Sequence, residues 1–328
     1  MCARPSRSAQ TLPNLPVDET KNLRVAILGE ALIDRFADGD VIGGAPFNVA
    51  RNLALLGAVP VMITRIGFDV PGDMIVAEFA RFGMTPDGLQ RDPERATGIV
   101  DVKMSGTHHR FEIGADAAWD HLDTAEAVRA VRENVPRVTY FGTLAQRGAV
   151  SRAAIHAALD ASDAVAFLDL NLREGPDNRT LAEDSLNRAK HVKVNDDELD
   201  RLVAWFLQPA GRGNRDALKL LVKRFDLERM TVTSGAEGWS CLDASQGWFD
   251  GAATPVNVRD TVGAGDAFAA VLLLGELSGW ALHASLRRAS AHASAVCGIA
   301  GAVDATSDIY VKARAAWAFE DDPTLGDL

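Results

Sequence analysis

Short apolar runs rich in β-branched residues alternate along the chain with segments whose apolar residues recur every three or four positions. The run at 23–29 ends in glycine, as is typical of a buried strand. A helical pattern follows over 47–56, then a second strand at 59–66 and a second helix at 73–82. Each of these two helical patterns is followed by a glycine, which favours helix termination.

Residues 97–113 depart from this alternation. Two strand-like runs flank the polar turn Ser-Gly-Thr at 105–107, which predicts a β-hairpin, and the stretch 36–42 is expected to pair nearby. From residue 124 onward the alternation is regular. Helices are expected at 125–134, 149–161, 181–188, 196–207, 216–225, 266–277 and 282–298, and strands at 138–141, 165–169, 191–194, 229–233 and 239–250, the last as a hairpin. This order predicts an α/β sandwich with a largely parallel sheet covered on both faces.

Composition narrows the class of protein. The chain has 328 residues, 47% of them hydrophobic, and a net charge of −11, which disfavours binding to nucleic acid or an anionic membrane. No window approaches the ~18 apolar residues of a membrane span.

Cys2, Cys241 and Cys297 form no close pair, so we expect reduced thiols and a cytoplasmic location. Residues 1–22 are expected to be a disordered leader and 318–328 a frayed acidic tail.

One late segment has the features of an anion site. Residues 260–266 read Asp-Thr-Val-Gly-Ala-Gly-Asp, and an apolar helical pattern follows at once. Unpaired N–H groups at a helix N-terminus carry partial positive charge, and the small residues 263–265 let an anion approach them. Asp266 is expected to stay ionised beside this dipole and to accept a proton from a substrate hydroxyl. An ordinary capped helix is the alternative interpretation.

A second segment, residues 43–50, reads Gly-Gly-Ala-Pro-Phe-Asn-Val-Ala. Gly43 and Gly44 permit close approach of a ligand. Asn48 offers both a donor and an acceptor to neighbouring hydroxyls of a polyol. A tight turn with a buried asparagine is the alternative interpretation. No Walker P-loop and no Gly-x-Gly-x-x-Gly after a strand occurs in the sequence, which disfavours those two nucleotide-binding classes.

Together the two segments resemble the N-terminal and C-terminal signatures of the PfkB (ribokinase-like) carbohydrate kinases. The similarity extends over about residues 23–315. It implies an ATP-dependent kinase of small sugars with a ribokinase-like three-layer sandwich and a small β-sheet lid. One kinase domain would span 23–317, with lid strands near 35–43 and 97–113. The resemblance also implies ATP and Mg²⁺ at the site and leaves room for a homodimer formed through the lid.

The resemblance assigns roles to individual positions. Asp266 would be the catalytic base, and the anion hole would consist of Gly263, Ala264 and Gly265. Residues 169–173, Asp-Leu-Asn-Leu-Arg, resemble a segment of fructokinases and 2-keto-3-deoxygluconate kinases. The Arg173 guanidinium can hold phosphate or carboxylate oxygens through paired hydrogen bonds, with a surface ion pair as the alternative. The expected substrate-binding residues are Asp34, Gly43, Gly44, Asn48, Asn171, Arg173 and, on the hairpin, Arg110.

Two further matches to the family predict the residues that bind the nucleotide and its Mg²⁺ ion. Residues 195–198 resemble the family's N-x-x-E motif, in which Glu198 would orient the waters of a Mg²⁺ ion; a carboxylate at a helix start is the alternative. Residues 231–238 match the strand and turn beside ATP. The expected nucleotide contacts are Asn195, Thr233, Gly235, Gly238 and Gly265, with Ser290 or His292 next to the adenine.

Two questions stay open at this point. Many relatives hold a monovalent cation beside the anion hole, and Asp260 could bind K⁺ here; Ala305 replaces a hydroxyl ligand of some relatives, which argues against potassium dependence. Fructose is the expected acceptor, and 2-keto-3-deoxygluconate, ribose and nucleosides are alternatives for the same fold. A non-catalytic sugar-binding sensor is the alternative from another class, and the intact Asp266 argues against it.

Overall fold

The computed structural model describes residues 23–37, 39–105, 108–173, 178–207 and 213–321. The side chains of 104–111 and 319–321 lie outside the described part. The leader expected at 1–22 and the chain end 322–328 also lie outside it. No helix in the described part is both long and apolar enough to cross a membrane.

The main sheet of the described chain has nine strands in the order β13-β12-β11-β10-β9-β8-β1-β4-β5. Two of its strands, β12 (Trp239–Asp243) and β13 (Gly247–Gly251), pair antiparallel at one edge. The other seven pair in parallel: β1 (Arg24–Leu28), β4 (Val59–Gly67), β5 (Leu89–Asp92), β8 (Val138–Phe141), β9 (Val165–Asp169), β10 (His191–Asn195) and β11 (Arg229–Thr233). The predicted α/β fold with a largely parallel sheet is confirmed.

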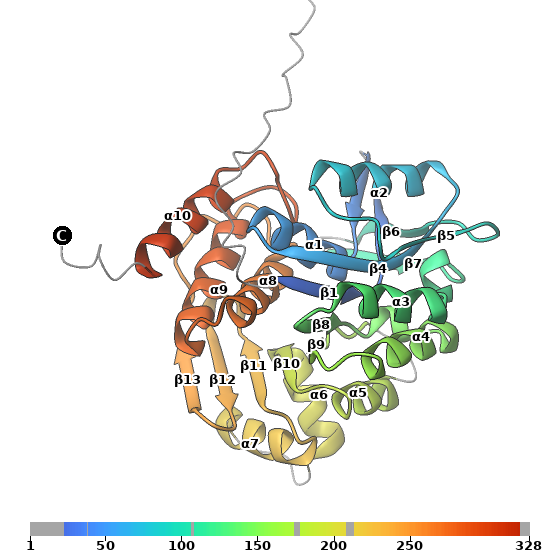
Figure 1. The fold of residues 1–328 in the computed structure, drawn as a ribbon. Coiled ribbons are helices and arrows are strands. Elements are labelled where there is room, and N and C mark those ends of the chain that lie inside the picture. The colour runs from blue at the N-terminus through green and yellow to red at the C-terminus, as the bar shows by residue number, and fades with distance from the viewer. Residues whose placement is uncertain (1–22, 38, 106–107, 174–177, 208–212, 322–328) are drawn as a thin grey trace, which may run out of the picture.

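Helices cover both faces of this sheet (Figure 1). Neighbouring residues of β1 face opposite ways: Val25 and Ile27 belong to one buried cluster and Ala26 and Leu28 to the other. The first cluster includes residues of α1 (Ala45–Leu55), α2 (Val70–Arg81), α8 (Ala264–Ser278), α9 (Leu282–Cys297) and α10 (Ile309–Asp321). The second includes residues of α3 (Thr124–Asn134), α4 (Ala149–Asp160), α5 (Asn178–Leu186), α6 (Asp196–Phe206) and α7 (Asn214–Arg224).

A second, four-stranded sheet has the order β3-β2-β6-β7. The predicted hairpin is confirmed as β6 (Gly98–Ser105) and β7 (His108–Ile113), which pair antiparallel. Strand β2 (Leu32–Phe36) joins β6 in parallel and β3 (Gly39–Gly43) antiparallel. Leu32, Val100 and Val102 form a small apolar cluster of this sheet.

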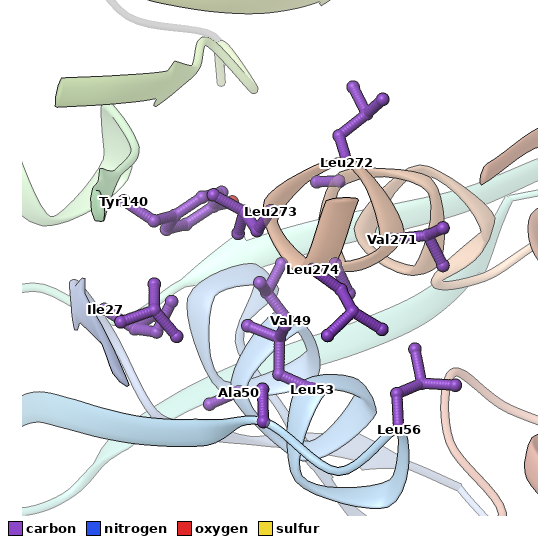
Figure 2. Packing of buried hydrophobic residues seen from close by; sticks show 14 of the residues in the cluster. Ile27, Val49, Ala50, Leu53, Leu56, Tyr140, Val271, Leu272, Leu273 and Leu274 are labelled. Atoms are coloured by element: carbon purple, nitrogen blue, oxygen red, sulfur yellow. The ribbon is translucent and has the colours of Figure 1, made fainter. Parts of the chain in front are cut away.

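Packing between α1 and α8 fixes the relative position of the two motif segments (Figure 2). Leu53 of α1 and Leu273 of α8 are fully buried in the same cluster, over Ile27 of β1. Burial of each such side chain contributes about 1.5–3 kcal/mol relative to exposure. Because both helices are held against one sheet face, the first turn of α8 stays beside α1.

The start of one helix differs from the expected one in a way that matters for the site, and two elements were not expected. Helix α8 begins at Ala264, because Gly263 with φ 79° is the residue before its first turn. Strand β5 and helix α10 were not expected from the hydrophobic pattern. Helix α10 continues to Asp321, into the segment expected to be frayed, and its Tyr310 and Trp317 are buried in the core.

Candidate active site

A cavity of about 1060 Å³ opens at the carboxyl ends of the parallel strands. In open α/β sheets this edge is where ligands bind. Its wall includes all but three of the expected site residues: Asp34, Gly44, Asn48, Asn171, Arg173, Asn195, Glu198, Thr233, Gly235, Gly238, Gly263, Ala264, Gly265 and Asp266. Gly43 and Asp260 do not line the cavity, although their neighbours Gly44 and Thr261 do, and the Arg110 side chain lies outside the described part of the structure.

The two signature segments meet in this cavity. Asn48 Nδ2 of α1 donates a hydrogen bond to Asp266 Oδ2 of α8 at 2.8 Å. The Asn48 carbonyl oxygen Oδ1 in turn accepts one from Arg51, so the amide is held with its donor toward Asp266. This contact joins residues 218 positions apart.

Burial raises the pKa of Asp266 to about 6. The nearby Asp169 carboxylate adds to the rise, whereas the Asn48 hydrogen bond and the positive charges of Lys193 and Arg173 lower it. The helix dipole alone predicted a readily ionised group, and burial outweighs that effect. A carboxyl group with this pKa is ionised near neutral pH and is a better proton acceptor than an exposed aspartate.

The first turn of α8 presents its backbone to the cavity. Gly263 has φ 79°, a left-handed conformation that a side chain disfavours, and a Cβ there would collide with Ala302. Ala264, Gly265 and Asp266 are the first three helical residues, and N–H groups at such positions have no partner within the helix. The arrangement suits an anion beside the Asp266 carboxylate.

Acidic and amide side chains line the other end of the cavity. Asp34 lies on β2, and its carboxylate packs so closely on Gly43 of β3 that a Cβ at Gly43 would collide with it. Burial raises the pKa of Asp34 to about 6, although the Arg173 charge lowers it. Asn171, just after β9, has φ 41°, a conformation that Asn adopts more readily than most residues.

Glu30 was not expected at the site from the sequence. It follows β1 directly, is buried, and lines the cavity. Burial raises its pKa to about 7; the neighbouring Asp266 also raises it, while the Arg173 charge opposes the rise. Its position next to Gly29 at the end of the first buried strand is the signal that could have marked it.

Asn195 and Glu198 form a reciprocal cap at the start of α6. Asn195 Oδ1 accepts the Glu198 N–H at 2.9 Å, and Glu198 Oε2 accepts the Asn195 N–H at 2.9 Å. Glu198 Oε1 accepts the Leu172 N–H at 2.7 Å. Each carboxylate oxygen keeps a further lone pair, and Glu198 lines the cavity, which fits a role in binding metal-coordinated water. Among the described residues, no His, Cys, Asp and Glu side chains cluster so as to hold a metal ion directly.

Small residues and residues with hydroxyl groups line the end of the cavity away from Asp34. Thr233 ends β11, and the turn after it contains Gly235 and Gly238, both at positive φ. Of the two candidates in α9, Ser290 lines this cavity, whereas His292 lies in a separate groove between α9 and α10. The adenine contact itself stays a prediction.

The Asp260 carboxylate is hydrogen-bonded to the backbone of two loops, one before α8 and one after α9. Its Oδ1 accepts the Val262 N–H at 3.0 Å and its Oδ2 accepts the Gly301 N–H at 2.9 Å. These two bonds tie the anion-site loop to the turn after α9. The carboxylate is therefore already engaged by protein donors, which, like Ala305, disfavours Asp260 as the possible potassium ligand.

Known proteins resemble this chain in both sequence and fold. A family model described as pfkB family carbohydrate kinase matches residues 29–309. A fructokinase of Escherichia coli is 28% identical over 265 residues, which cover 77% of this chain and 84% of that protein. The solved structure of a fructokinase with bound ATP from Xylella fastidiosa has a TM-score of 0.77 at 21% identity, covering 90% and 99% of the two chains. That of an uncharacterized sugar kinase from Pyrococcus horikoshii in complex with ATP has 0.71 at 25% identity, covering 85% and 93%.

The fold is thus that of the ribokinase-like α/β kinases, with a nine-stranded main sheet and a four-stranded smaller one. Because the family model covers most of its length, the chain belongs to the pfkB family and is a carbohydrate kinase.

Proposed function

We propose that the protein transfers the γ-phosphoryl group of ATP to a hydroxyl of a small neutral sugar, with fructose as the acceptor. The observation that carries this proposal is the 2.8 Å hydrogen bond between Asn48 and Asp266. It supports the proposal because the partly buried Asp266 carboxylate is bonded to Asn48, an expected sugar contact, and belongs to the first turn of α8, the expected anion site. The sequence similarity to an Escherichia coli fructokinase supports the choice of sugar.

In the proposed reaction the Asp266 carboxylate accepts the proton of the acceptor hydroxyl while that oxygen bonds to the γ-phosphorus. The bond from the γ-phosphorus to the bridging oxygen of ADP breaks at the same centre. The N–H groups of residues 264–266 stabilise the charge on the transferred group. Asp266 then loses its proton to solvent. Mg²⁺, held through water by Asn195 and Glu198, would neutralise phosphate charge when bound.

The charges at the sugar end favour a neutral acceptor. Glu30, Asp34 and Asp266 line this end, and Arg173 is the cation beside them. The carboxylate of an acidic sugar such as 2-keto-3-deoxygluconate would meet like charges except near Arg173. Neutral sugars such as fructose or ribose offer neighbouring hydroxyl groups instead, which can donate to the carboxylates and to the Asn48 oxygen.

A coupled assay of ADP release across fructose, ribose, 2-keto-3-deoxygluconate and nucleosides tests the proposal. Fructose should give the highest kcat/KM. A higher kcat/KM for the keto acid or for a nucleoside would show that fructose is not the preferred acceptor, while the proposed phosphoryl transfer would stand. Binding of fructose without ADP release would favour the sugar-binding sensor instead. The cytoplasmic location and the homodimer through the lid stay predictions.

A further inference from the structure

Arg51, which is buried about one turn after Asn48 on α1, donates hydrogen bonds to residues of three elements. Its Nη1 donates to Glu78 Oε2 of α2 at 3.2 Å. Its Nη2 donates to the Ile42 carbonyl oxygen of β3 at 2.9 Å and to Asn48 Oδ1 at 2.5 Å. The guanidinium therefore joins α1, α2 and the smaller sheet next to the hydrogen bond between Asn48 and Asp266.

Stability alone does not require a charge at this position. A buried ion pair is often no more stabilising than apolar side chains of similar volume. The Arg51 guanidinium lies 5.0 Å and 5.8 Å from the ring centroids of Phe47 and Phe82, so an apolar side chain would find partners here. Glu78 also has a second cationic partner, Arg81, at 3.0 Å. What distinguishes Arg51 from an apolar residue is the set of hydrogen bonds that it donates.

These hydrogen bonds determine the orientation of the Asn48 amide. Arginine has five donors and no acceptor, so only the oxygen of the amide can face Arg51. The amide nitrogen is then the atom that faces Asp266. In this orientation Asn48 donates to an ionised Asp266 and cannot accept a hydrogen bond from a protonated one. An amide free to turn over could accept that bond and would stabilise the protonated form, so a fixed amide favours the ionised carboxylate.

The positive charge of Arg51 acts in the same direction. It interacts with the Asp266 carboxylate and lowers the pKa of Asp34, which burial raises to about 6. Hydrogen bond and charge therefore both favour ionised carboxylates at the sugar end of the cavity. The variants described below leave the other titratable groups that act on Asp266 or Arg51 in place: Glu30, Tyr140, Asp169, Arg173, Lys193 and Tyr310.

We propose that Arg51 is a positioning residue for the base: it fixes the Asn48 amide so that Asn48 donates to Asp266 and cannot accept from it. Glu78 holds the guanidinium in place through the second nitrogen. This inference rests on the proposed function in taking Asp266 as the base. Because Ile42 belongs to β3, the same guanidinium also connects the base to the strand of the smaller sheet that ends at Gly43.

The double variant Arg51→Met/Glu78→Gln tests this role and leaves no unpaired charge buried. In this variant the Asn48 amide can turn over and accept from protonated Asp266. The pKa of Asp266 should therefore rise by about 0.5–1 unit, the range expected for one hydrogen bond between neutral groups. Arg51→Lys should show less than half of this rise, because an ammonium also donates and cannot accept. Arg81→Met is the control, because Arg81 is a half-exposed partner of Glu78, and it should leave the pKa of Asp266 unchanged.

The pKa is measured by ¹³C NMR titration of protein labelled at the aspartate side-chain carboxyl carbons, with Asp266→Asn to identify the Asp266 signal. The melting temperature of each variant is recorded alongside. A purely structural role of Arg51 predicts a lower melting temperature with an unchanged pKa of Asp266, and this result would overturn the proposal. An equal rise in Arg81→Met would overturn it as well.

The titration needs no sugar, so its outcome is separate from that of the kinase assay. A raised pKa of Asp266 in the double variant of a chain that phosphorylates no sugar would retain the role of Arg51 and reject the proposed function. An unchanged pKa in a chain that phosphorylates fructose would do the reverse.

Discussion

Replacing Asn48 with leucine should shift the acid limb of the pH–rate profile to higher pH. Asn48 Nδ2 donates to Asp266 Oδ2 at 2.8 Å, and this bond favours the ionised carboxylate. Leucine has nearly the same shape and cannot donate. Arg51 keeps its bonds to the Ile42 carbonyl and to Glu78, so the replacement mainly affects Asp266.

The size of the shift follows from the burial of the pair. A hydrogen bond to a charged group contributes about 1.5–3 kcal/mol. One pKa unit corresponds to about 1.36 kcal/mol. Because Asn48 is buried and Asp266 is only partly exposed to the cavity, screening by water removes a small part of this energy. The pKa should rise by about 1–2 units from its value of about 6.

The assay is kcat/KM for the sugar as a function of pH, which reports the ionisation of the free enzyme. The wild-type value should fall as pH drops below about 6, since the base must be deprotonated. In Asn48→Leu the fall should begin at about pH 7–8. Asn52→Ala is the control: Asn52 lies one turn further along α1 and bonds the Asn48 carbonyl and Tyr310 instead. The Asn52→Ala variant should have a lower melting temperature, and the acid limb of its pH–rate profile should lie at the wild-type pH. An unshifted limb in folded Asn48→Leu would refute Asp266 as the titrating base.

Three further outcomes test other parts of the site. Asp34→Ala should raise the sugar KM by about 10- to 100-fold, as expected for lost hydrogen bonds to a charged group, with kcat little changed; an unaltered KM would remove Asp34 from the sugar site. Adding sugar should slow amide hydrogen exchange over 97–113 if this hairpin closes as a lid, and unchanged exchange would contradict closure. Replacing K⁺ by choline should leave kcat unchanged, because Asp260 is held by the Val262 and Gly301 N–H groups; loss of activity would make Asp260 a potassium ligand.

The fold could be predicted because most strands of the parallel sheet are continuous apolar runs. Strand β5 could not, because its sequence Leu-Gln-Arg-Asp is polar and only its pairing with β4 makes it a strand. Helix α10 is held by Tyr310 and Trp317, which are buried against the core. The apolar residues of this segment are too weakly patterned along the sequence to predict that burial. For β5 tertiary pairing overrides local propensity. The alanine-rich sequence of α10 itself favours a helix, and only its docking on the core could not be predicted.

The site was predictable where a motif has a local physical meaning. Gly263 and Asp266 at a helix start are one example, since the anion-binding property belongs to the helix itself. The pKa of Asp266 was not predictable in this way, because it depends on burial and on Asp169, which comes from another strand. Glu30 and Lys193 were missed for the same reason. A lysine between two valines in a buried strand is nevertheless a signal that sequence alone provides.

The most direct test of the proposed chemistry is the rate of fructose-dependent ADP release by Asp266→Asn, measured together with its affinity for fructose. Asparagine keeps the size of the side chain and cannot accept the hydroxyl proton. The account predicts fructose binding close to that of the wild type and a kcat lower by about 10²- to 10⁴-fold, the usual contribution of a general base. Near-normal turnover by Asp266→Asn would contradict it.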